Sequence, residues 1–187
     1  YGYKINCNAV DKDNNNALMI AVKNGNVACI KALYNTYGYK INCNAVDKNN
    51  NNALMIAAEN GYIACINTLY NTYGDKINDK RVNIDNNNVL MITVKNSHSY
   101  CIKAIYYNNY NRVKKCDQRN TFHYTINCNA VDKDDNNVLM LAVKNGHADC
   151  ITTLYNIYGK KINYNAVNKD KNNVLMLAVE KGCTACI

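Results

Sequence analysis

The sequence predicts an all-α solenoid, in which short helix pairs stack one on the next around a continuous core. The first observation is that the pattern Asn-Ala/Val-Leu-Met recurs along the whole chain. The five methionines each occupy its fourth position, at intervals of 36, 36, 49 and 36 residues: Met19, Met55, Met91, Met140 and Met176. The second is that every helix expected in a copy is too short to be stable alone, so neighbouring copies must supply the missing burial.

Each copy begins with a short extended stretch and a turn, and then enters its first helix. In the first copy, residues 11–15 are Asp-Lys-Asp-Asn-Asn, and Asn and Asp tolerate left-handed backbone in turns. Asn16 is the expected N-cap of a helix over residues 17–24, because its side-chain oxygen can accept a free backbone N–H. Gly25 is expected to end that helix in the left-handed conformation.

The second helix of the copy is predicted over residues 27–36. Val27, Ile30, Leu33 and Tyr34 recur at helical spacing, which gives this segment one apolar face. Gly38 then ends the helix and leads into the next copy. The result is a turn, a helix, a glycine, a second helix and a second glycine in each unit.

We expect one repeat array over residues 1–187. Its units cover residues 5–40, 41–76, 77–125, 126–161 and 162–187, and the last is truncated. The third unit departs in two ways: Ser97 replaces the glycine after its first helix, and its outgoing link is 13 residues longer. We place this insertion at residues 106–125.

Several features bear on context. Residues 1–4 match residues 37–40, the end of a repeat, so we expect the chain to be a piece of a longer array. No apolar run approaches the length needed to span a bilayer. The sequence has no Asn-x-Ser/Thr sequon, which is compatible with an intracellular, cytoplasmic setting.

The cysteines are arranged in columns, which argues against a disulfide scaffold. The chain has ten, and one column repeats at the same place in every unit, at Cys29, Cys65, Cys101, Cys150 and Cys186. We interpret it as a buried helical position that suits a small hydrophobic residue. A second column, Cys7, Cys43 and Cys128, is replaced by Asp79 and Tyr164 in the other units, so it is not a required half of a bridge.

The residues of each unit resemble the ankyrin repeat family. Residues 11–26 align without a gap to the family pattern D-x-x-G-x-T-P-L-H-L-A-A-x-x-G-H, and residues 37–42 resemble its G-A-D-V-N link. The family's Gly-His pair occurs as Gly146-His147. The resemblance covers essentially the whole chain and implies an all-α ankyrin-repeat solenoid with hairpin-like turns.

The sequence also departs from the family pattern. Asn-Ala or Asn-Val stands where the family has Thr-Pro, and Met stands where it has His. In the family, that Thr and His hydrogen-bond locally and tie one repeat to the next. Here we expect Asn to keep the cap and Met to replace the polar tie with apolar contact. The turn glycine is Asn, Asp or, at Lys171, a residue that adopts left-handed backbone less readily.

No catalytic, cofactor or metal site is expected. Cys183 and Cys186 form a C-x-x-C pair, which can be redox-active or half of a zinc site. A structural role is favoured, because Cys186 belongs to the core column and no second ligand pair is suitably spaced. His98, His123 and His147 do not form an arrangement with a nucleophile, and no phosphate-binding glycine loop is present.

The resemblance implies a protein–protein interaction scaffold or adaptor that binds through turn tips and the exposed side of the first helices. The helix positions are Lys23, Glu59, Lys95, Lys144 and Glu180. The tip positions are Lys12, Asp13, Asn15, Lys48, Asn49, Asn51, Ile84, Asp85, Asn87, Lys133, Asp134, Asn136, Lys169, Asp170 and Asn172. The alternative is a targeting segment of a larger enzyme or ubiquitin-ligase-type adaptor. We expect a monomer whose partner is another protein.

Nucleic acid is a less favoured partner. The formal charge is +8, but Lys alternates with Asp and Glu outside the insertion. The insertion itself contains Arg112, Lys114, Lys115 and Arg119 among aromatic residues, and such mixtures can bind single-stranded nucleic acid weakly. The plainer interpretation of the insertion is a surface loop.

Overall fold

A computed structural model describes residues 5–116 and 126–184, and it confirms the all-α prediction. The α-helices are α1 (Ala17–Lys23), α2 (Val27–Tyr37), α3 (Ala53–Glu59), α4 (Ile63–Tyr73), α5 (Val89–Lys95), α6 (Ser99–Cys116), α7 (Val138–Lys144), α8 (Ala148–Tyr158) and α9 (Val174–Glu180). Short 3₁₀ turns follow three of them: η1 (Gly38–Lys40), η2 (Gly74–Lys76) and η4 (Gly159–Lys161). Within the described ranges, β-pairing is limited to one isolated bridge between Val10 and Asn16.

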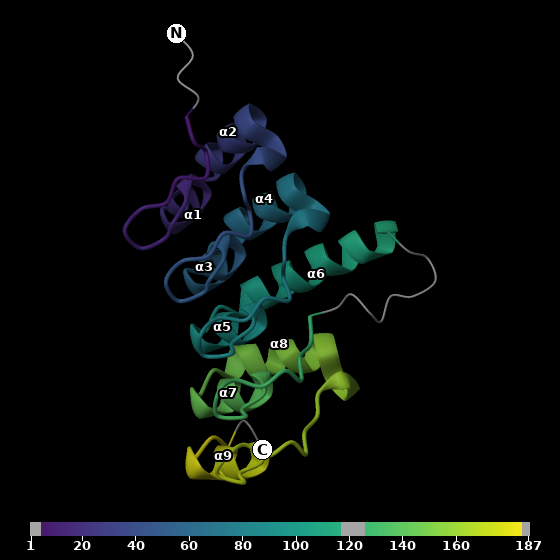
Figure 1. Ribbon diagram of the computed structural model, residues 1–187. Coiled ribbons are helices and arrows are strands. Elements are labelled where there is room, and N and C mark those ends of the chain that lie inside the picture. Colours follow the sequence, from purple (N-terminus) through teal and green to yellow (C-terminus); the bar gives the residue numbers. More distant parts are fainter. Residues whose placement is uncertain (1–4, 117–125, 185–187) are drawn as a thin grey trace.

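The helices form two parallel rows. The first row contains α1, α3, α5, α7 and α9, and the second contains α2, α4, α6 and α8 (Figure 1). Each helix contacts its neighbours along its own row, and each first-row helix from α1 to α7 also contacts the second-row helix that follows it in sequence. The hairpin-like turns project beside the first row (Figure 1).

The N-cap asparagines hold the first row together. Asn52 Oδ1 accepts a hydrogen bond from the backbone N–H of Met55 at 3.0 Å, and equivalent caps begin α1, α5, α7 and α9. The same side chain donates from Nδ2 to the carbonyl of Asn78 in the next repeat at 2.9 Å. Asn16, Asn88 and Asn137 make the same second bond. The expected cap is therefore present, and asparagine also supplies the polar tie that we expected to be lost.

The methionine column packs between repeats, as expected. Met19, Met55, Met91 and Met140 are fully buried, whereas Met176 is half exposed because no described helix packs beyond α9. Leu and Val side chains beside the first three extend one core as far as α7 and α8, and Met140 and Val143 pack with Leu177 and Ala178 of α9 in a second cluster. The exposure of Met176 indicates that the other four methionines are buried by the repeat that follows each of them.

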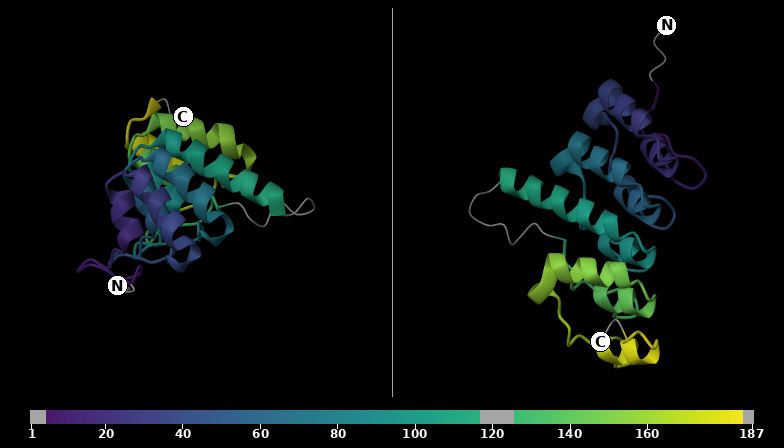
Figure 2. Two further views of the ribbon diagram at one scale, coloured as in Figure 1. Left: turned by 90° about the horizontal axis from the view of Figure 1, so that it is seen from above. Right: turned by 180° about the vertical axis from the view of Figure 1, so that it is seen from behind.

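The insertion is helical in its first half, which corrects the expectation of a longer link. In the other repeats, a glycine with positive φ ends the second helix, at Gly38, Gly74 and Gly159. The residue at this position in the third repeat is Tyr110, so α6 continues to Cys116 and is 18 residues long (Figure 2). Residues 117–125 lie outside the described part of the chain.

Every turn requires one residue with left-handed backbone. Asn14, Asn50, Asn86 and Asp135 adopt φ between 61° and 64°, and Lys171 adopts φ of 64° at the same place. Ser97, which replaces the helix-ending glycine, also has positive φ, at 60°. Asn and Asp accommodate this conformation better than Lys or Ser do.

Lys171→Asn is therefore expected to stabilise the fifth repeat by about 0.5–1 kcal/mol. The gain comes from backbone strain alone, because the Lys171 side chain is exposed. Urea denaturation followed by circular dichroism would measure it. Lys169→Asn, at an exposed position of the same turn, is the matched control and should leave the midpoint unchanged.

Candidate protein-interaction surface

The turn tips, residues 12–15, 48–51, 84–87, 133–136 and 169–172, share one internal hydrogen-bond pattern. In the first turn, Asp11 Oδ1 accepts from the backbone N–H groups of Asp13 and Asn15, each at 2.8 Å. These bonds lower the pKa of Asp11, the Asn15 N–H contributing most. Asp47, Asn83, Asp132 and Asn168 accept in the same way. This column, which we did not single out from the sequence, sets the shape of each tip.

Successive tips are joined by backbone hydrogen bonds. Lys48 N–H donates to the Asp13 carbonyl at 3.2 Å, and Ile84 N–H donates to the Asn49 carbonyl at 3.1 Å. The bonds from Lys133 to Asp85 and from Lys169 to Asp134 continue the series at 2.9 and 3.1 Å. The five tips therefore form one connected row, which we call the tip ladder.

Opposite charges pair along the tip ladder. Lys48 Nζ lies 3.1 Å from Asp13 Oδ1, and Lys133 Nζ lies 2.8 Å from Asp85 Oδ1. The Lys133 ammonium lowers the pKa of Asp85, and the same hydrogen bond raises the pKa of Lys133. Both pairs are exposed to solvent, so they contribute little to stability and can open to a partner.

The predicted helix positions lie at the C-terminal ends of the first-row helices. Lys23, Glu59, Lys95, Lys144 and Glu180 are the last residues of α1, α3, α5, α7 and α9. The charge of Lys95 contributes to lowering the pKa of Asp85, and the charge of Lys23 contributes to lowering the pKa of Asp11. These helix ends therefore lie close to the turns. The structure thus brings the helix positions and the tips onto one side of the array.

One column of the predicted site residues is buried. Asn15, Asn51, Asn87 and Asn136 are almost inaccessible, and Asn172 is half-buried. Asn136 Nδ2 bonds the Asp132 carboxylate inside its own turn, and its Oδ1 accepts from Asn168 of the next repeat at 3.1 Å. Burial places these amides inside the tip ladder, so the exposed surface consists of the other predicted residues.

The third repeat carries a buried polar cluster that sequence reasoning missed. Asp79 replaces the cysteine of the second column, and its carboxylate bonds Arg112 Nη2 at 2.6 Å and Asn109 Nδ2. The side chains of Asp79 and Arg112 are only 3% and 14% exposed. Burial raises the pKa of Asp79, and the Arg112 guanidinium opposes part of that rise. We call Asp79, Asn109 and Arg112 the polar brace.

The polar brace occupies the place of an aromatic contact found in other repeats. Tyr34 meets Tyr73 edge to face at 5.2 Å, and Tyr106 meets Tyr158 at 5.6 Å. Tyr70 has the Arg112 guanidinium over its ring at 5.7 Å instead, and its hydroxyl donates to Asp79 at 3.4 Å. The sequence did contain a signal for this cluster. In the repeat that carries the insertion, Asp79 stands at the position of Cys43, and Asn109 stands at the position of Tyr73.

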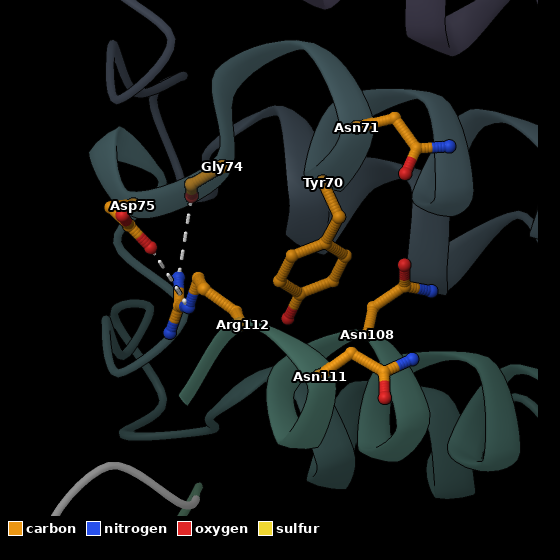
Figure 3. A pocket seen from close by; sticks show the side chains of 7 residues that line it. All are labelled: Tyr70, Asn71, Gly74, Asp75, Asn108, Asn111 and Arg112. Carbon is orange, nitrogen blue, oxygen red and sulfur yellow. Dashed lines mark hydrogen bonds and ion pairs between the residues drawn. The ribbon is translucent and has the colours of Figure 1, made fainter. Parts of the chain in front are cut away.

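A polar pocket of about 530 Å³ opens beside the brace, between α4 and the extended part of α6. Its lining is Tyr70, Asn71, Gly74, Asp75, Asn108, Asn111 and Arg112 (Figure 3). Arg112 donates to the Gly74 carbonyl at 3.4 Å and lies 3.9 Å from the Asp75 carboxylate, so it closes one end. Asn71 from α4 and Asn108 and Asn111 from α6 line the opposite part (Figure 3).

The remaining candidates of the sequence serve the structure or fall outside the described residues. In the part of the chain that the structure describes, seven cysteines are free thiols, and burial raises the pKa of Cys101 and Cys150 to about 11. Cys183 takes part in a disulfide, whereas Cys186, Arg119 and His123 lie outside the described residues. His98 and His147 bond the carbonyls of Glu59 and Lys95 in the preceding repeats. Among the described residues, no group of His, Cys, Asp and Glu could hold a metal ion.

Comparison with known families identifies the repeat. The family described as ankyrin repeats, in three copies, matches residues 1–81 and 90–187. The chain belongs to the ankyrin repeat family. No curated protein matches the chain in sequence. Ankyrin repeats are in general protein-interaction modules and are typically not catalytic. No helix in the described part of this ankyrin array has the length and apolarity to cross a membrane.

Proposed function

We propose that this ankyrin array is a protein–protein interaction module that binds its partner through the exposed residues of the tip ladder and the adjoining first-row helix ends. The observation that supports it best is the set of backbone hydrogen bonds between successive tips. A surface that is already ordered loses little conformational entropy on binding. Several tips can therefore contribute to affinity together.

The composition of the ladder suits a protein partner. Ile84 is an exposed apolar residue in the middle tip, and charged or polar residues occupy the neighbouring tips. An apolar anchor within a polar rim is the usual arrangement of a binding hot spot. The charges along the ladder are mixed in sign, whereas a duplex nucleic acid would require a uniformly basic surface.

The test is affinity capture with the intact chain, followed by titration of the purified partner. We expect Ile84→Asp combined with Lys48→Glu and Lys169→Glu to weaken binding at least about tenfold, because the anchor and two exposed charges are changed. Lys31→Glu, at an exposed position of α2, is the control and should leave the affinity unchanged. Equal affinity of the ladder variant and the unmodified chain would refute this binding surface.

A further inference from the structure

The exposed side of α6 carries a row of tyrosines. Tyr100, Lys103, Tyr107 and Tyr110 recur at three- and four-residue intervals, which places them on one helix face. The three tyrosines are 70%, 57% and 41% exposed. Ile102, Ile105 and Asn109 lie buried on the other side of the same helix. We call the exposed residues the tyrosine face.

This face is confined to the third repeat. The three tyrosine positions are occupied by small or polar residues in the other second-row helices: Ala28, Asn35 and Gly38; Ala64, Asn71 and Gly74; and Asp149, Asn156 and Gly159. At the positions equivalent to Ile102, Ile105 and Asn109, by contrast, the other second-row helices all carry Ile, Leu and Tyr. Packing of the repeats therefore does not account for tyrosine at these exposed positions.

Part of the face is already arranged for stacking. The rings of Tyr106 and Tyr110 are stacked, with centroids 6.2 Å apart and an angle of 16° between their planes. Tyr106 is held by an edge contact with the buried ring of Tyr158 at 5.6 Å. Because Tyr110 remains 41% exposed, a further planar group can extend this stack.

The charge of α6 favours an anionic ligand. The helix contains Lys103, Arg112, Lys114 and Lys115 and no acidic residue. Asp79 neutralises Arg112, which leaves the lysines as the net charge of the helix. Acidic residues on the adjacent elements are Asp149 at the start of α8 and Asp75 in η2. On the tyrosine face itself, Lys103 is exposed and supplies the positive charge.

The polar pocket between α4 and α6 adjoins this face at Asn111. Asn108 Nδ2 donates to Asn67 Oδ1 at 2.7 Å and to the Ala104 carbonyl at 2.8 Å. Within the described residues, no hydrogen bond is found for the side chains of Asn71 and Asn111, which also line the pocket. Free carboxamides offer one donor and one acceptor group, the combination that pairs with the edges of nucleobases.

We propose that the tyrosine face and the adjoining pocket bind single-stranded nucleic acid. Bases stack on Tyr107 and Tyr110, the phosphates lie near Lys103, and the pocket carboxamides contact a base edge. From the sequence, this ligand ranks below a protein, because lysine alternates with acidic residues outside the insertion. The folded helix adds the exposed tyrosine row and its stacked ring. The site is separate from the tip ladder, so it does not depend on the proposed function.

The experiment is fluorescence anisotropy of the full chain with fluorescein-labelled oligouridylate and, in a second arm, oligothymidylate. We expect binding at about 50 mM salt that weakens strongly by about 200 mM salt. Tyr107→Ala combined with Tyr110→Ala should weaken it at least about tenfold, since each stacked base contributes about 1–3 kcal/mol. Lys103→Gln should lower the slope of the salt dependence by roughly one.

Matched controls establish whether binding is specific to the tyrosine face. Tyr155→Ala removes a similarly exposed tyrosine from α8, and Lys48→Ser with Lys133→Ser alters only the tip ladder; both should bind the oligonucleotides like the unmodified chain. Circular dichroism checks that each variant is folded. Absence of binding at low salt, or full binding by the double tyrosine variant, would overturn the proposal. Equal competition by polyglutamate would also overturn it, because it would indicate a surface for acidic proteins.

Discussion

Replacing Arg112 by methionine is expected to lower the free energy of unfolding by about 3–5 kcal/mol. Methionine keeps much of the apolar stem of arginine but leaves the Asp79 carboxylate, which is 3% exposed, without its counter-charge. The Gly74 and Ile77 carbonyls would also lose their donor from Nη1. Urea denaturation followed by circular dichroism at neutral pH measures the loss.

The loss should depend on pH with a definite sign. Burial raises the pKa of Asp79, and removing Arg112 removes the main group that opposes this rise. The folded variant then binds a proton that the unfolded chain has already released, so its stability falls as pH increases above the ordinary carboxyl range. The deficit of Arg112→Met is therefore smaller in mildly acidic buffer than at neutral pH.

The other repeats suggest the matched control. Asp79→Cys and Asn109→Tyr give the third repeat the residues found at the equivalent positions of the second repeat, Cys43 and Tyr73, and they are combined with Arg112→Met. Apolar replacement of a whole buried ion pair is often neutral, so this variant should recover to within about 1.5 kcal/mol of the unmodified chain. If Arg112→Met alone were as stable as the unmodified chain, the polar brace would contribute nothing to the free energy of unfolding.

Asn52→Ala is expected to cost about 2–3 kcal/mol, the second-largest effect. The change removes the cap of α3, where Oδ1 accepts from Met55 N–H, and the tie in which Nδ2 donates to the Asn78 carbonyl. Loss of a cap costs about 1 kcal/mol, and the unpaired groups add the remainder. Thermal or urea denaturation of the purified variant provides the measurement.

Two further substitutions separate the cap from the tie. Asn52→Thr keeps an N-cap oxygen but has no donor that reaches the next repeat, so about half of the loss should remain. Asn173→Ala removes a cap from α9, where no tie to a following repeat is found among the described residues. Its cost should be about 1 kcal/mol or less. If Asn52→Ala and Asn173→Ala proved equally mild, the tie would have no energetic role.

The regular features of the fold could be predicted because each is repeated. Asn16 and its equivalents had a recognisable capping position, and the methionine column had a fixed interval, so the helix starts and the core followed from local rules. The turns, whose tips were expected to bind a partner, project beside the first row (Figure 1). Whether they bind a partner remains a prediction.

The irregular features could not be predicted, because they depend on contacts between residues far apart in sequence. From composition, Arg112 was predicted to lie in a basic loop. The continuation of α6 instead brings it to Asp79, which lies in the link before α5. From its alignment to the ankyrin pattern, Asn136 was predicted to be an exposed tip residue. Its amide instead lies inside the turn and hydrogen-bonds with Asp132 and Asn168. In both cases, burial decided the role of a polar side chain.

The polar brace lies at the contact between the second and third repeats, near the middle of the described array. In a linear array, the stability of each unit depends on its own terms and on the contacts with its immediate neighbours. Arg112 of α6 donates to the carbonyl of Gly74, which follows α4, so the brace reaches from the third repeat to the second. Removing one of its partners would therefore weaken the coupling between these two repeats more than the helices within either one.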